Sequence, residues 1–186
     1  MRLNNDGRRA SLLLLICGIL ALAPRTSGQG YSQDQIKADA LINLVGFMQW
    51  PQGTILPAPS PITFCLLGRS ATGDELERSA QSKQFGGHKI TVNRMKGPQE
   101  LAGCHLVFLG ASAEKLQEKL IESAKGLPIA LVAEIPGFAR KGGTLNLGLQ
   151  NTRIIFEINT DSAEQAHLKI NPRLLAAASL VRAGRQ

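Results

Sequence analysis

Two cysteines, Cys65 and Cys104, are the pair of residues in this 186-residue chain best suited to react with each other. Each lies in an apolar segment that ends at a glycine, ITFCLLG and GCHLVFLG, which is typical of a buried strand. Two such strands side by side would bring the cysteine Cα atoms within the roughly 4.4–6.8 Å that a disulfide requires. The alternative is two free cysteines in the core, where this residue type is common. The choice between a disulfide and two free cysteines depends on the compartment of the protein, because disulfides persist in oxidising environments.

The histidines offer no comparable pair. Cys104 and His105 are adjacent, and adjacent residues of a strand point to opposite faces, so they cannot form a nucleophile–base dyad. His88, His105 and His167 show no metal-ligand spacing with each other or with a cysteine. No G-x-S-x-G motif occurs around any serine. We therefore expect no catalytic residue and no bound metal.

Gly68 and Gly73 frame a G-x-x-x-x-G between an expected strand and an expected helix, where a phosphate-binding loop would lie. Asp74 and Glu75 follow at the positions where such a loop needs Lys and Ser or Thr, and two carboxylates would repel a nucleotide. The chain also lacks a basic stripe interleaved with aromatic residues. We expect no cofactor, no nucleic-acid partner and no enzymatic activity.

Phe47, Met48 and Trp50 form a cluster just before a proline-rich segment, 51–61. One interpretation is a hydrophobic staple that packs the end of a helix onto a sheet. The other is a partner-binding surface, since Trp and Met are enriched at protein interfaces. Composition alone leaves both open.

The elements that must position these residues follow from hydrophobic periodicity and from turn signals. Helices are expected at 32–49, 72–83, near Gln99, at 112–124, from 161 and at 172–181, and strands at 62–67, 89–93, 106–109, 129–132, 144–149 and 153–159. The last two strands, joined by a tight turn at Gln150-Asn151, are typical of a β-hairpin. Strands separated by helices indicate an α/β fold, a three-layer sandwich whose mostly parallel sheet has helices on both faces and a C-terminal β-hairpin.

The N-terminus has the pattern of a secretory signal peptide. Arg2, Arg8 and Arg9 precede an apolar run, 12–23, and small residues follow up to Gly28. The run is too short for a membrane span, which needs about 20 apolar residues. We expect a signal peptide at 1–28, a single domain at 29–186, and a periplasmic protein that has no membrane insertion after cleavage. In that oxidising compartment the two remaining cysteines are expected to form a disulfide.

The mature chain resembles the YfiR-like family of periplasmic proteins. The resemblance starts at Ile36-Lys37-Ala38 and is carried by Leu41, Asn43, Phe47, Trp50-Pro51, the two cysteine segments, Gly137-Phe138, Gly142-Gly143, Phe156 to Asn159 and Leu168 to Val181. Asn43, Pro51, Phe138, Gly142, Gly143, Phe156 and Asn159 are the family-motif residues to which we assign structural roles.

The resemblance implies a regulator that represses a YfiN-like inner-membrane diguanylate cyclase by binding its periplasmic region, which lowers cyclic di-GMP and biofilm formation. It also implies a homodimer and a YfiB-like outer-membrane lipoprotein that relieves repression. Cys65 and Cys104 match one of the family's two cysteine pairs, whereas the second pair has no counterpart at 144–152. The alternative is a periplasmic small-ligand sensor with a crevice at the carboxyl ends of the parallel strands, feeding another membrane signalling partner.

We predict that the exported protein has lost its leader near Gly28. Signal peptidases cut after small residues that follow a short apolar run, so the periplasmic form should lack Met1 and the arginines after it. Intact-mass analysis of the periplasmic fraction measures the cleavage site. A cytosolic protein that keeps Met1 would contradict both the compartment and the reason for expecting a disulfide.

Overall fold

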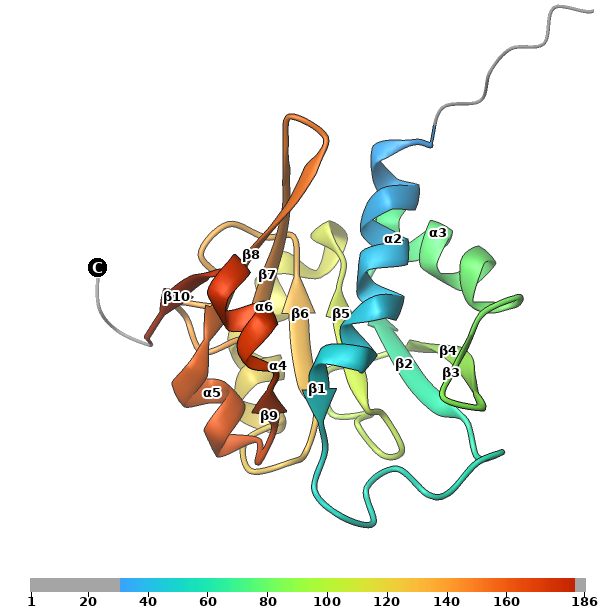
Figure 1. Cartoon of the computed structure of the whole chain (residues 1–186). Helices are drawn as coiled ribbons and strands as arrows, with labels where there is room; N and C mark the ends of the chain where they lie inside the picture. The colour runs from blue at the N-terminus through green and yellow to red at the C-terminus, as the bar shows by residue number, and fades with distance from the viewer. Residues whose placement is uncertain (1–30, 183–186) are drawn as a thin grey trace, which may run out of the picture. The chain divides into compact units, whose positions relative to one another are not determined.

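The computed structural model describes residues 31–182, so the expected signal peptide at 1–28 lies outside the described part of the chain. The main sheet has eight strands in the order β10-β8-β7-β6-β5-β2-β4-β3 (Figure 1). Their bounds are β2 Ile62–Leu67, β3 Gln84–Phe85, β4 His88–Met95, β5 Leu106–Leu109, β6 Ala130–Ala133, β7 Leu145–Gln150, β8 Arg153–Asn159 and β10 Ser179–Val181. A separate two-stranded sheet pairs β1 Met48–Gln49 with β9 Lys169–Ile170.

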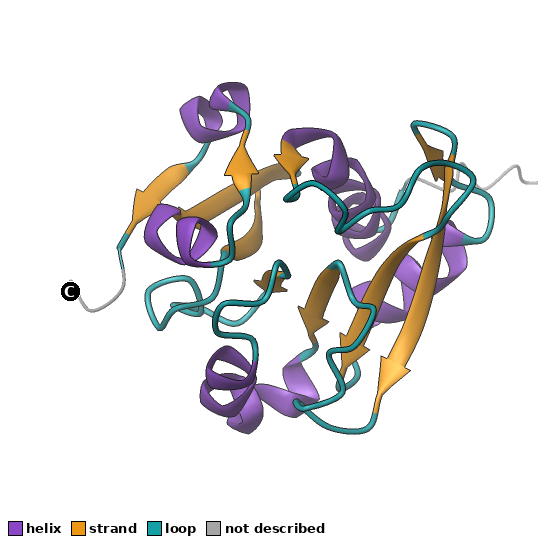
Figure 2. Cartoon of the chain, turned by 90° about the horizontal axis from the view of Figure 1, so that it is seen from below, coloured by secondary structure: helices purple, strands orange, loops and turns teal. Residues whose placement is uncertain are grey.

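The sheet is mostly parallel and lies between helices, which confirms the expected fold class. Strands β4, β2, β5, β6 and β7 run parallel, and β8 returns antiparallel to β7. The helices are α2 Gln33–Leu44, η1 Val45–Phe47, α3 Ala71–Ala80, η2 Ala111–Leu116, α4 Gln117–Ser123, α5 Thr160–Gln165 and α6 Pro172–Ala177. Figure 2 shows helices on both sides of the strands.

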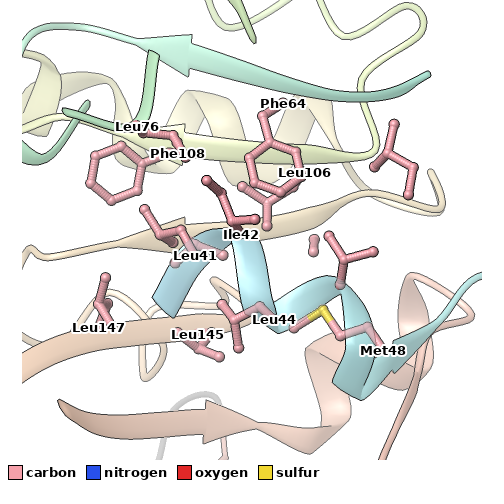
Figure 3. Packing of buried hydrophobic residues seen from close by; sticks show 14 of the residues in the cluster. Leu41, Ile42, Leu44, Met48, Phe64, Leu76, Leu106, Phe108, Leu145 and Leu147 are labelled. Carbon is pink, nitrogen blue, oxygen red and sulfur yellow. The ribbon is translucent and has the colours of Figure 1, made fainter. Parts of the chain in front are cut away.

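The sheet separates two hydrophobic clusters because alternate side chains of each central strand point to opposite faces. Phe64 and Phe108 pack under α2 and α3, whereas Leu67 and Leu109 pack under η2 and α4. Figure 3 shows how α2 places its buried leucines and isoleucine against the first of these faces. The continuous apolar segments in the sequence are therefore strands buried on both faces, as parallel sheets require.

Helix α2 begins as the sequence predicts and ends earlier. Ser32 accepts a hydrogen bond from the backbone of Gln35, whose side chain accepts one from Ser32 N–H, which is a complete capping box. The helix stops at Leu44 instead of continuing to position 49. Met48 then pairs with Ile170 of β9, so a strand contact distant in sequence overrides the local helical pattern.

Three further local expectations were wrong. The final helix ends at Ala177, and Ser179–Val181 becomes strand β10 beside β8. The segment around Gln99 is a turn and not a helix. The hairpin turn is Asn151-Thr152, one residue later than expected, and both residues have the positive φ, 48° and 63°, that a type I′ turn requires.

A disulfide joins Cys65 to Cys104, with a Cα–Cα distance of 5.8 Å, and confirms the expected pairing. Cys65 lies inside β2, and Cys104 lies in the loop that enters β5. Both cysteines are buried among the side chains of the α4 face. The bond therefore fastens the start of β5 to the middle of its neighbour.

No helix among residues 31–182 is long and apolar enough to cross a membrane.

The turn between β6 and β7 explains four of the family-motif residues. Phe138 is fully buried, and its ring lies so close to Gly143 that a Cβ atom there would overlap it. Gly142 has a φ of +113°, which favours glycine. Asn159 donates from Nδ2 to Ala139 O at 2.7 Å, so the end of β8 holds the same turn. These residues act through packing and hydrogen bonding.

Gly143→Ala should destabilise the protein by about 1–3 kcal/mol, the usual cost of overpacking a filled core. The cause is the ring of Phe138, since φ at Gly143 is not in the left-handed region. Phe138→Leu creates space at the same point, so the double variant should lose less than the sum of the two single losses. Urea unfolding of the four proteins measures this, and strict additivity would contradict the assigned contact.

Candidate functional site

The structure separates the three residues of the expected partner-binding cluster. Phe47 is 37% exposed, and Met48 is 5% exposed and belongs to the core. Trp50 is half-buried, and its indole N–H donates to His105 O at 3.2 Å. Met48 and Trp50 therefore fit the staple interpretation, and Phe47 is the member whose side chain is open to a partner.

Phe47 borders an apolar groove of about 310 Å³ between α2, β8 and α6. The groove is lined by Ala40, Asn43, Leu44, Phe47, Ile154, Phe156, Arg173, Leu174 and Ala177. Two family-motif residues that are far apart in sequence, Asn43 and Phe156, meet Phe47 here. This groove is the candidate functional site.

Local sequence explains each wall of the groove. Ala40, Asn43, Leu44 and Phe47 follow the i, i+3, i+4, i+7 spacing that places residues on one side of a helix. Ile154 and Phe156 alternate along β8 and so share one face, which forms the floor. The third wall, α6, begins after Asn171, whose side chain accepts from Arg173 N–H at 2.9 Å.

Arg173 gives the groove its electrostatic character. It is the charged residue among the lining side chains, and within residues 31–182 no carboxylate lies within 4.0 Å of it. Asn43 is exposed at the edge and adds an amide. The sequence analysis missed Arg173, although Pro172 at the start of α6 marked the helix that carries it. The groove can hold an apolar ridge beside a negative charge, and it offers no nucleophile or general base.

His105 has a structural role that its sequence neighbours did not reveal. Its Nδ1 accepts from Thr63 N–H at 2.9 Å, so Nε2 carries the proton and donates to Thr54 O at 3.2 Å. Its backbone carbonyl accepts from Trp50 and from Ala130 N–H. The residue thereby connects the 51–61 loop to β2 and β6. Within that loop, Pro51 O accepts from Thr54 N–H at 3.1 Å.

The loops that follow β2 and β5 pack closely against each other at the point where the sheet order reverses. A Cβ atom at Gly68 would lie 2.5 Å from that of Ala113, and one at Gly110 would lie 2.9 Å from the backbone of Arg69. Arg69 N–H also donates to Ser112 Oγ at 2.7 Å. The two loops are therefore in direct contact at the edge of the sheet where the ligand-sensor alternative expected its site.

A polar cluster lies at the carboxyl end of β6. The buried hydroxyl of Thr72 lies 2.7 Å from Asp34 Oδ1 and 2.8 Å from Glu134 Oε1, and Lys37 forms ion pairs with both carboxylates. The Thr72 hydrogen bond lowers the pKa of Asp34, burial opposes it, and Lys37 adds to the lowering. Burial acts to lower the pKa of Lys37, but Glu134 and Asp34 together raise it.

The sequence analysis missed this cluster. Its four residues come from α2, α3 and the segment after β6, and no local pattern connects them. Only Asp34 and Lys37, three residues apart on α2, form a pair that could have been read from helical spacing.

The fold and the groove together define an α/β protein whose exposed site is suited to binding. The particular family follows from comparison with known proteins. A family model described as YfiR/HmsC-like matches residues 34–179, and the chain belongs to this family. That family supports a role as a periplasmic regulator.

Several solved structures resemble the chain, including two with a TM-score of 0.54. One is a conserved domain protein from Vibrio cholerae, with 15% identity and a TM-score of 0.54 over 78% of this chain and 59% of that one. The other is an ABC domain in complex with L-Trp from Streptococcus pneumonia, with 11% identity and a TM-score of 0.54 over 80% of this chain and 60% of that one. The chain thus spans about three fifths of each structure, and these likenesses show the fold alone.

Asp34→Asn should reduce the loss of stability in acid. Because the folded pKa of Asp34 is below its ordinary 3.8, its contribution is present above that value and is lost as the pH falls through the folded pKa. The free energy of unfolding, measured from about pH 5 to about pH 2, should therefore fall less steeply in the variant. Asp161→Asn, at a partly exposed carboxylate outside the cluster, is the control, and equal slopes for Asp34→Asn and the native protein would contradict the role given to this cluster.

Proposed function

We propose that this protein is a periplasmic repressor of a membrane-bound, YfiN-like diguanylate cyclase. It binds the periplasmic region of the cyclase, lowers cyclic di-GMP and so lowers biofilm formation. The family supports the regulatory role. The observation that carries the proposal is the convergence of Asn43, Phe47 and Phe156 in one solvent-open apolar groove.

The groove indicates the chemistry of the docking segment. Two helices flank a floor of β8 side chains, an arrangement that accepts an amphipathic helix whose apolar side chains repeat at i, i+3 or i+4, and i+7. Arg173 at the α6 wall favours an acidic side chain beside that apolar ridge. The occupant is therefore an amphipathic segment of the cyclase's periplasmic region with an acidic residue at its edge.

Repression requires only that the protein bind the inactive form of the cyclase better than the active form. A ligand shifts a two-state equilibrium by its differential affinity, and about 5.5 kcal/mol moves the ratio from 1:99 to 99:1. Burial of Phe47 is one source of such a difference, because a large aromatic anchor can carry much of an interface.

Two further partners belong to the proposal. A YfiB-like outer-membrane lipoprotein would sequester the protein and relieve repression, and the protein would act as a homodimer. Hairpin β7–β8 supports these interactions with exposed apolar surface, since Ile155 is 44% exposed on the face opposite Phe156. No cysteine pair constrains this hairpin, and the disulfide of the described residues is Cys65–Cys104.

Deleting the gene should raise cyclic di-GMP and surface attachment, and complementation with Phe47→Ala should fail to lower them. Loss of an aromatic anchor should weaken binding by about tenfold or more. Leu127→Ala, at a similar exposed fraction but outside the groove, should complement fully. Circular dichroism must first show that both variants are folded.

Unchanged cyclic di-GMP in the deletion strain across growth conditions would contradict the repressor role. A rise in the deletion strain together with full complementation by Phe47→Ala would instead keep the repressor and reject the groove as its docking site.

A further inference from the structure

A second concave site lies on different elements from the groove. It is a cavity of about 280 Å³ between the end of α4, the start of β6, the turn before β7, and α5. Its volume is near the lower limit of small-molecule pockets, which hold about 300–1,000 Å³. It shares no lining residue with the groove.

The inner wall of the cavity is apolar with two hydroxyl groups. Ile129, Leu131 and Ala166 are buried and form the apolar part. Ser162 is 9% exposed, and its hydroxyl makes no hydrogen bond to another described residue. Thr144, at 2% exposure, accepts from Leu131 N–H at 3.0 Å and has its own O–H free to donate within the described chain. Both hydroxyls are able to donate to an acceptor that enters the cavity, and Ser162 Oγ keeps contact with solvent.

The rim adds a positive charge. Lys125 is 2.8 Å from Glu122, and that ion pair neutralises both groups. Lys141 also lines the cavity and has no carboxylate within 4.0 Å among residues 31–182. Lys141 therefore places a positive charge, without a paired carboxylate among the described residues, at the rim of a cavity that has hydroxyl groups and an apolar inner wall.

We infer that this cavity binds a small organic carboxylate that has a compact apolar body. The carboxylate accepts from Ser162 and lies against Lys141, and the apolar body covers Ile129 and Ala166. Hydrogen bonds from neutral donors to a charged acceptor are among the stronger kinds, which favours the anion over its amide. This inference does not rest on the cyclase proposal, because it uses other residues and needs no protein partner.

Benzoate is the probe, benzamide is its uncharged analogue, and inorganic phosphate is an anion without an apolar body. Titrated into the ¹⁵N-labelled mature protein, benzoate should produce saturable shifts at the amides of Gly142, Thr144 and Ser162, and neither control should do so. Ser162→Ala should weaken benzoate binding by about tenfold, and Lys141→Gln should weaken it by a few fold. Lys119→Gln, an exposed lysine of α4 outside the cavity, should leave binding unchanged.

Four results would overturn the inference: shifts that do not saturate, equal binding of benzamide, binding of phosphate without benzoate, or equal weakening by Lys119→Gln and Lys141→Gln. The amide spectrum of Ser162→Ala verifies that it is folded. Repression by Lys141→Gln in the complementation assay should stay normal, so failure here and failure of the repressor proposal are distinguishable.

Discussion

The two-sided burial of parallel strands β2 and β5 is the constraint on which the rest of the structure depends. Phe64 and Phe108 require cover on one face, and Leu67 and Leu109 require it on the other. Helices α2 and α3 supply the first cover, and η2 with α4 supplies the second. The loops after these two strands consequently pack against each other at the carboxyl end, the edge at which open α/β sheets usually bind ligands.

The groove exists because strands β7 and β8 extend beyond the helices that cover the sheet. Strand β6 pairs with β7 only at Leu145 and Asn146, and β10 pairs with β8 only from Glu157. The distal half of the hairpin therefore extends past the neighbouring strands, as Figure 1 shows. Helices α2 and α6 both reach its inner face but do not meet over it, so Phe156 stays partly uncovered. An exposed apolar patch of this kind marks an interaction surface.

Sequence reasoning could predict the features that depend on local periodicity. The buried strands around Cys65 and Cys104, the hairpin and the Ser32 cap all carry their signal within a few residues. It could not predict that Met48 leaves the helix, because the cause is a strand pairing with Ile170 more than one hundred residues away. The ion pair of Lys37 with Glu134 could not be predicted either, because a charged residue in the sequence does not indicate which distant residue it will pair with. Phe47, expected to bind a partner, and Phe156, expected to have a structural role, both line the groove, whereas Arg173 was not predicted.

Asn159 is the junction between the groove and the cavity. It ends β8, whose Ile154 and Phe156 form the groove floor, and it caps α5, whose Ser162 lines the cavity. Its Oδ1 accepts from Ser162 N–H at 3.0 Å and its Nδ2 donates to Ala139 O at 2.7 Å, so both polar atoms of this fully buried amide are hydrogen-bonded. A movement of α5 relative to β8 would leave it unpaired, at a cost of about 1–3 kcal/mol. Asn159 therefore fastens the start of α5 to the end of β8.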